Sequence, residues 1–233
     1  FISNLIFAKK ILVNSKAVKK DLIKFYNNFF QKKIVNLPFV PIEKNIQKNY
    51  KYIFEKKYPL FSNTKFILIS NRWWDHKNHI SVIKAYKNIK PYLDEKFGNR
   101  NCTLVLTGSL KGNNNGTLLS EKATKYINKN NLHNHIFILG HVNDDFHNYL
   151  FSNCIGVIQP TLFEGGPGGF SAWEAIGLGK PLALSKIDIN FELIDYVKNI
   201  YYFKPKSIKE IQNILVKIYS GKLKNTFLKN FNR

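Results

Sequence analysis

The stretch "TLFEGGPGGFSAWEAIGLGKPLALS", which runs from Thr161 to Ser185, decides how we interpret the chain. It places four glycines and a proline between Glu164 and Glu174 and then continues into an apolar, alanine-rich segment. The apolar run Ile155–Gln159 before it predicts a strand, and the residues after the glycines predict a helix. The first N–H groups of a helix lack partners within the helix, so a glycine-rich turn at this point can bind an anion.

The two glutamates on either side of the glycines are suited to hydroxyl ligands. A helical side chain leans toward the N-terminus of its helix, so Glu174 can reach back to a ligand at the turn. A carboxylate accepts hydrogen bonds from hydroxyls but repels phosphate. We therefore expect Glu174 to hold a ribose and Glu164 to accept from sugar hydroxyls. The alternative is a glycine-rich turn whose glutamates face water and cap the helix.

Short apolar runs recur along the chain and alternate with segments of helical periodicity. The predicted strands are Ile11–Val13, Ile34–Leu37, Phe66–Ser70, Thr103–Thr107, Ile136–Leu139, Ile155–Gln159, Leu182–Ser185 and Ile200–Phe203. The predicted helices are Ser15–Phe29, Lys77–Tyr92, Leu118–Asn128, Asp144–Phe151, Ser171–Leu178 and Ser207–Tyr219. Strands that are apolar on both faces and alternate with helices predict an α/β fold with a Rossmann-like, doubly wound parallel sheet. Ligands of such a sheet bind beyond the carboxyl ends of its strands.

The chain divides into four parts. Residues 1–37 fit the sheet poorly, and we expect them to be the tail of a preceding domain. Residues 38–62 begin with prolines and predict a linker followed by an aromatic-rich helix. Residues 63–221 form the predicted sheet domain, and residues 222–233 are expected to start a C-terminal helical segment. The chain begins with Phe1 and contains no Met, so we expect a fragment of a longer protein.

The formal net charge is +21, from 36 Lys and Arg residues against 15 Asp and Glu residues. This charge would suit a nucleic-acid-binding domain or an anionic membrane surface. Arginine, the residue favoured for base and phosphate recognition, stands only at Arg72, Arg100 and Arg233, whereas lysines are scattered over nearly every segment. We therefore favour a compositional origin for the charge, with no nucleic-acid partner and a weak preference for anionic membranes and ligands.

Further features limit the location and the chemistry. No run of about 18 apolar residues occurs, and Lys9 and Lys10 interrupt the N-terminal apolar run, so neither a membrane span nor a signal peptide is predicted. We expect a cytoplasmic protein, with peripheral contact at the inner face of the membrane as an option. Cys102 and Cys154 are predicted to be buried free thiols. No spacing of Cys and His suggests zinc, so we expect no metal.

A second polar cluster, "NRWWDHKNH", follows the predicted strand Phe66–Ser70. Arg72 and Lys77 then stand at the carboxyl end of that strand, where two cations would suit a pyrophosphate, one as a planar fork and one as a point charge. The alternative is that both are solvated loop residues. Trp73 and Trp74 are expected to pack within the protein.

With both clusters in place, the chain resembles the C-terminal, donor-binding half of the group-1 (GT4) retaining glycosyltransferases, which have the GT-B fold. That family has an Arg and a Lys five apart after the first strand of this half, as Arg72 and Lys77 stand here. It also has an E-x7-E motif after a P-x-x-x-E-G turn, followed by EA-x-x-x-G-x-P, and Glu164 and Glu174 occupy these positions. Nine residues separate the glutamates here, which lengthens the Gly-Pro-Gly loop and leaves Glu174 on the helix. The segments "ILVNSKAVKKDLI", "KIVNLPFVP", "LVLTGS" and "IFILGHVNDDFHNYL" also resemble the family.

The resemblance implies that a sugar is transferred, with retention of anomeric configuration, from a UDP- or GDP-linked donor to a hydroxyl. It implies no metal or cofactor, and a sugar or lipid-linked acceptor in cell-surface polysaccharide or glycolipid synthesis. Residues 63–221 would bind the donor, and residues 1–37 would end the acceptor domain. The catalytic residues would be Arg72, Lys77 and Glu164. The donor-binding residues would be Gly140, His141, Val142, Gly165, Gly166, Gly168, Gly169, Phe170 and Glu174.

Two further interpretations stay open at this point. One is a non-catalytic module that binds nucleotide sugars, and the other is an epimerase of the GT-B type. A fragment of a transferase would itself behave as a binding domain, because the cleft of a GT-B enzyme needs both halves.

Overall fold

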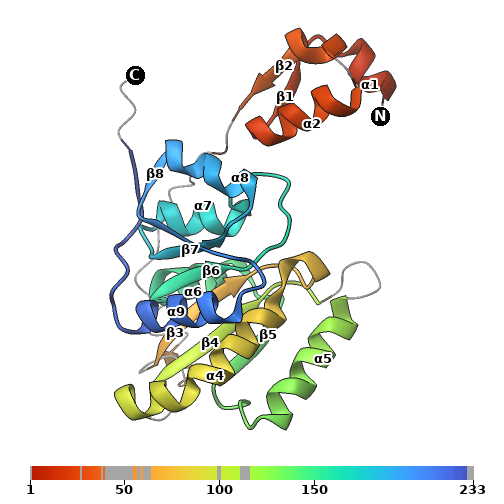
Figure 1. The fold of residues 1–233 in the computed structure, drawn as a ribbon. Helices are drawn as coiled ribbons and strands as arrows, with labels where there is room; N and C mark the ends of the chain where they lie inside the picture. Colours follow the sequence, from red (N-terminus) through yellow and green to blue (C-terminus); the bar gives the residue numbers. More distant parts are fainter. Residues whose placement is uncertain are drawn as a thin grey trace.

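The computed structural model describes residues 2–26, 28–37, 39, 55–56, 59, 64–98, 101–110 and 116–229. Figure 1 shows two units, a small N-terminal one in red and orange and a larger α/β unit that holds the rest of the described chain. The small unit lies beyond helices α7 and α8 of the larger one.

The larger unit is built on a six-stranded parallel sheet. Its strands are β3 (Lys65–Ser70), β4 (Cys102–Thr107), β5 (Ile136–Gly140), β6 (Gly156–Gln159), β7 (Leu182–Ser185) and β9 (Ile200–Phe203). Their spatial order is β5-β4-β3-β6-β7-β9, with every neighbouring pair parallel. This is the doubly wound Rossmann order, so the predicted fold class is confirmed. The chain reverses its direction of winding between β3 and β6, where such sheets bind their ligands.

Helices cover both faces of this sheet. They are α4 (His79–Phe97), α5 (Gly116–Lys129), α6 (Asp144–Asn153), α7 (Gly169–Gly177), α8 (Asp188–Phe191) and α9 (Ile208–Tyr219). Successive side chains of a strand point to opposite faces. Ile67 and Ile69 therefore pack in one core, with α4, α5 and α9, while Phe66 and Leu68 pack in a second core, with α6 and α7. Because helices cover both faces of the sheet, both faces of each strand are buried, which explains the continuous apolar runs in the sequence.

The small unit contains α1 (Ile2–Phe7), β1 (Ile11–Val13), α2 (Lys16–Tyr26), a 3-10 helix (Asn28–Lys33) and β2 (Ile34–Asn36). β1 and β2 pair in parallel. Ser15 caps α2 as predicted, because its Oγ accepts from the N–H of Val18 at 3.0 Å. The helix ends at Tyr26 rather than Phe29, and the 3-10 helix follows. Helix α1 was not predicted.

A carboxylate of the larger unit binds the start of α2 in the small unit. The two Glu192 carboxylate oxygens accept from the backbone N–H groups of Lys16 and Ala17 at 2.7 Å and 2.8 Å. The Lys16 ammonium also lies 2.8 Å from the Asp195 carboxylate. With Ser15, these contacts satisfy the first three N–H groups of α2, which have no partner inside the helix.

The prediction of a helical segment at residues 222–233 is wrong for residues 222–229, which are the ones that the structure describes. They contain no helix, and Phe227–Leu228 forms strand β10, which pairs antiparallel with β8 (Val197–Lys198). The Thr226 hydroxyl donates to the carbonyl of Lys180 at 2.8 Å and fixes this segment as it crosses the domain. Most of the predicted aromatic-rich helix in residues 38–62 lies outside the described residues.

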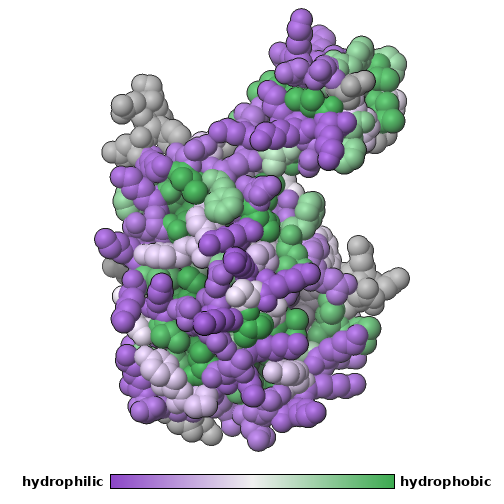
Figure 2. Space-filling view, viewed as in Figure 1, coloured by the Kyte–Doolittle hydropathy of each residue, from purple (hydrophilic) through white to green (hydrophobic). Residues whose placement is uncertain are grey.

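The distribution of polar residues on the surface agrees with the scattered lysines in the sequence. Figure 2 shows hydrophilic residues spread over the visible face of both units, with hydrophobic residues between them. Among the described residues, no helix combines the length and the apolar character that crossing a membrane requires.

Candidate functional site

Two adjoining cavities open at the carboxyl ends of β3 to β6, and they share Ser70, Asn71 and Arg72. The first, which we call the ion-pair cavity, has a volume of about 560 Å³ and is lined by Asn14, Phe39, Ser70, Asn71, Arg72, Trp74, Lys77, Glu164, Gly165, Gly166, Gly169, Phe170 and Ser171. The second, the histidine cavity, has a volume of about 870 Å³ and is lined by Ser70, Asn71, Arg72, Thr107, Gly108, Ser109, His141, Val142, Asp144, His147, Asn148 and Glu174. Both lie where the sheet topology predicts a ligand.

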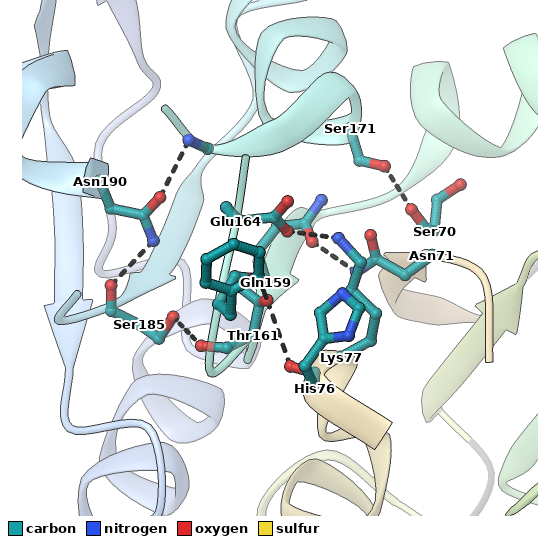
Figure 3. Close-up of polar contacts among 12 residues, drawn as sticks. Ser70, Asn71, His76, Lys77, Gln159, Thr161, Glu164, Ser171, Ser185 and Asn190 are labelled. Atoms are coloured by element: carbon teal, nitrogen blue, oxygen red, sulfur yellow. Dashed lines mark hydrogen bonds and ion pairs between the residues drawn. The ribbon is translucent and has the colours of Figure 1, made fainter. Parts of the chain in front are cut away.

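Lys77 and Glu164 form an ion pair in the first cavity, with 2.5 Å between Nζ and Oε1 (Figure 3). The loop that carries Glu164 is fastened to the loop that carries Lys77. The carbonyl of His76 accepts from the Leu162 N–H at 2.6 Å and from the Thr161 hydroxyl at 3.2 Å. These contacts bring together two charges that lie 87 residues apart in the sequence.

The turn that presents Lys77 is held by the next residue. Asn78 has a φ of 54°, in the left-handed region, and ends the 3-10 turn Asp75–Lys77. Its side-chain amide donates to the carbonyls of Pro160 and Pro205 at 3.1 Å and 2.8 Å. The turn is thereby fixed to the end of β6. Burial, together with the nearby Lys77 ammonium, lowers the pKa of His76 within this turn.

The glycine loop is anchored from below by Asn190, which is fully buried. Its Oδ1 accepts from the Gly168 N–H at 2.9 Å, and its amide nitrogen donates to the Ser185 carbonyl at 2.9 Å (Figure 3). The Gly169 N–H donates to the Gly166 carbonyl at 3.3 Å. The N–H groups of Gly168 and Gly169 are therefore engaged within the protein, although both residues stand among those that the resemblance implies for donor binding.

Several loop residues still face the ion-pair cavity. Gly165, Gly166, Gly169 and Phe170 line it, whereas Gly168 lines neither cavity. Phe170 and Ser171 lie in the first turn of α7, where backbone N–H groups lack acceptors within the helix and can bind an anion. Gly169 has a second role, because a Cβ atom there would lie 3.3 Å from the Glu164 carboxylate. The absence of a side chain lets Glu164 fit against the helix start.

Glu174 lies on α7, as predicted, and lines the histidine cavity. His147 from α6 reaches it, with 3.0 Å from Nε2 to each carboxylate oxygen. His141 and Val142 line the same cavity, and Gly140 ends β5 behind them without lining it. His147 was not predicted as a site residue, since no spacing in the sequence relates it to Glu174.

Arg72 lies at the junction of the two cavities. Its guanidinium stands 5.6 Å from the ring centroid of Trp74, and among the described residues it forms no ion pair with a carboxylate. Trp73 is buried and stacks on His79 at 4.3 Å, so its predicted packing role is confirmed, while Trp74 borders the ion-pair cavity. No cluster of His, Cys, Asp and Glu fit to hold a metal occurs in the described part of the chain. The metal-free site stays a prediction.

Residues 51–232 match the family "Glycosyl transferases group 1", and the chain belongs to this family. The predicted likeness to GT-B glycosyltransferases is thus confirmed. A sequence search among curated proteins found no match.

Solved structures agree in fold. HepE from Anabaena, in complex with UDP and glucose, is 17% identical with a TM-score of 0.74, over 94% of this chain and 56% of HepE. A glycosyltransferase from Rickettsia africae is 19% identical with a TM-score of 0.73, over 91% and 53% of the two chains. A mutant of S. aureus TarM, in complex with Fondaparinux, alpha-GlcNAc-glycerol and UDP, is 17% identical with a TM-score of 0.67, over 94% and 38%. The chain thus spans about half the length of the first two.

Proposed function

We propose that this chain is the donor-binding half of a glycosyltransferase that takes a sugar from a nucleoside diphosphate and transfers it, with retention, to a hydroxyl. The observation that carries the proposal is the position of Arg72 between two cavities at the point where the sheet reverses its winding. One cavity offers Glu174 for ribose hydroxyls. The other offers Glu164 for the hydroxyls of the transferred sugar.

The diphosphate fits between these two carboxylates. Arg72 borders both cavities, and the first turn of α7 adds the N–H groups of Phe170 and Ser171 on the side of the ion-pair cavity. Negative charge builds up on the diphosphate as the bond to the sugar breaks, and fixed cations and dipoles stabilise it. Arg72 and Lys77 supply positive charge here, so we propose a reaction without a metal or cofactor.

The Lys77–Glu164 pair adds a positioning role. Glu164 is 8% exposed and its partner Lys77 is 11% exposed, so solvent screens the pair little. The ammonium keeps the carboxylate in one orientation, and its free oxygen lone pairs can accept from sugar hydroxyls. Both charges then act on the same sugar phosphate, Glu164 on the sugar and Lys77 on the adjoining phosphate.

We propose UDP as the donor nucleotide, with GDP as the alternative. The support comes from HepE and TarM, whose solved structures contain UDP. For the acceptor we propose a sugar or lipid-linked hydroxyl in cell-surface polysaccharide or glycolipid synthesis. The proposed location is the cytoplasm, with contact to anionic membrane lipids favoured by the net charge of +21.

Isothermal titration of the folded chain with UDP, GDP and ADP tests this proposal. We expect binding of at least one of the three. Since the chain spans about half the length of the solved neighbours, we expect no transfer from UDP-sugars, because a water-excluded cleft that aligns donor and acceptor needs a second wall. Absence of heat with all three nucleotides on folded protein contradicts the proposal. Turnover of a donor at enzymatic rates contradicts the division into halves.

A further inference from the structure

We infer that His147 is a positioning residue that holds the Glu174 carboxylate in the orientation needed to accept from ribose hydroxyls. The inference rests on the proposed function and deepens it, because it names the group that sets the preference for a ribonucleotide. Glu174 and His147 come from different helices, α7 and α6, and meet in the wall of the histidine cavity.

The geometry is that of one donor shared between two acceptors. His147 Nε2 lies 3.0 Å from both Oε1 and Oε2 of Glu174. The side chains are 24% and 18% exposed, so the pair is at the cavity wall, reachable by a ligand yet shielded on its inner side. A carboxylate has about four lone-pair sites, so both oxygens can still accept from hydroxyls in the cavity.

His147 itself is held firmly. Helix α6 begins at a capped residue, since the Asn143 side chain accepts from the Phe146 N–H at 2.9 Å. Phe146 is buried in the second core, which fixes the orientation of the first helical turn. The imidazole also lies against the ring of Phe151, one turn further on, with 4.7 Å between ring centroids. The donor to Glu174 is therefore preorganised by packing that does not involve the ligand.

Without this donor, the Glu174 carboxylate could turn toward other charged groups that line the cavity. Arg72 from the loop after β3 lines the same cavity, as do Asp144 from α6 and His141 from the loop after β5. A Glu174 side chain that rotates toward Arg72 would withdraw the cation from the diphosphate, and a hydrogen bond to His147 opposes that rotation. The effect of His147 on a ligand should thus pass through Glu174.

The test uses dissociation constants of the full 233-residue chain for UDP and for its 2′,3′-dideoxy analogue. The unmutated chain should bind UDP about tenfold more tightly than the analogue, as expected for a hydrogen bond to a charged acceptor. His147→Leu should weaken UDP binding about three- to tenfold and change analogue binding by less than twofold. His147→Gln, whose amide can donate, should recover most of the loss. In a Glu174→Gln background, His147→Leu should have no further effect.

Controls separate this role from a structural one. His133→Leu, at an exposed histidine that lines neither cavity, should change neither constant. If His147→Leu fails to fold, His147→Gln and the ¹⁵N chemical shifts of the wild-type imidazole test the inference instead. We expect the shifts of a ring whose Nε2 carries a hydrogen. We also expect the Nε2 resonance to move when UDP is added and to stay in place when the analogue is added.

Equal weakening of UDP and analogue by His147→Leu overturns the inference, as does an undiminished effect in the Glu174→Gln background. A chain that binds UDP and its analogue equally overturns the inference and leaves the proposed nucleotide site standing. A folded chain that binds none of UDP, GDP and ADP overturns the proposed function and this inference together.

Discussion

The ammonium nitrogen of Lys77 lies 2.5 Å from Oε1 of Glu164, and both side chains are almost fully buried in the cavity wall. One residue follows β3 and the other follows β6, so the pair joins the two strands between which the sheet reverses its winding. The loop-to-loop hydrogen bonds at His76 set the distance. The central charges of the site are therefore part of the fold as well as of the proposed chemistry.

Loss of one partner of this pair should destabilise the chain more than loss of both. Lys77→Met leaves the Glu164 carboxylate buried without its cation and should lower the free energy of unfolding by about 3–5 kcal/mol. The double variant Lys77→Met with Glu164→Leu should recover most of that loss. Urea denaturation measures wild type, Lys77→Met, Glu164→Leu and the double variant, with Lys217→Met, at an exposed position on α9, as the control. A double variant as unstable as the sum of its single changes would show that the pair is not coupled.

Two glycines of the same loop should differ in how strongly an alanine substitution destabilises the chain. Gly168 has a φ of 70°, and a Cβ atom there would lie 2.6 Å from the Cβ of Ala172 and 2.9 Å from Cδ1 of Leu193. Left-handed backbone costs about 1–2 kcal/mol and overpacking about 1–3 kcal/mol, so Gly168→Ala should lower the unfolding free energy by about 2–5 kcal/mol. Gly165→Ala meets no atom within 4 Å and should stay within about 0.5 kcal/mol of wild type. Equal melting curves for both variants would contradict the described loop.

The contact between the two units should depend on Glu192. Its carboxylate accepts from the N–H groups of Lys16 and Ala17, so Glu192→Ala removes this capping contact from both groups, while Ser15 still accepts from the Val18 N–H. Loss of a cap costs about 1 kcal/mol, and hydrogen exchange of these two amides should rise about fivefold. Asp188→Ala, at an exposed residue at the start of α8, is the control and should leave the exchange unchanged. Unchanged exchange in Glu192→Ala would show that the units do not meet through this carboxylate.

Acid stability should depend on His79, a histidine outside the proposed chemistry. Burial lowers the pKa of its imidazole from the ordinary 6.5 to about 3, so the folded chain resists protonation that the unfolded chain accepts. The unfolded state then binds more protons below pH 6.5, and stability present above that pH is lost as the pH falls toward 3. Between pH 7 and 4.5 this contributes about 2–3 kcal/mol.

His79→Phe keeps a ring against Trp73 and removes the titration. Between pH 7 and 4.5, the unfolding free energy of this variant should therefore fall by about 2–3 kcal/mol less than that of wild type. The control His133→Phe, at an exposed histidine, should show the same pH dependence as wild type. Parallel pH dependence of wild type and His79→Phe would mean that His79 is protonated in the folded state as easily as in the unfolded one.

The parts of the site that could be predicted from sequence are those that depend on strand ends. Parallel strands place their carboxyl ends at one edge, so Arg72, Lys77 and Glu164 were expected together from the runs that precede them. Asn190 and His147 could not be predicted, because a hydrogen bond between residues 22 or 27 positions apart leaves no periodic signal. The same holds for Glu192, which caps a helix 176 residues away.

Binding of nucleoside diphosphates by three chains tests the central claim most directly, namely that the diphosphate binds at Arg72 and the ribose at Glu174. The measurement is the dissociation constant of UDP and of 2′,3′-dideoxy-UDP for wild type, Arg72→Ala and Glu174→Gln. Arg72→Ala should weaken both ligands alike, by about tenfold or more, since both keep the diphosphate. Glu174→Gln should weaken UDP about tenfold and the dideoxy analogue by less than twofold. Equal weakening of both ligands by Glu174→Gln, or unchanged binding in Arg72→Ala, would contradict the claim.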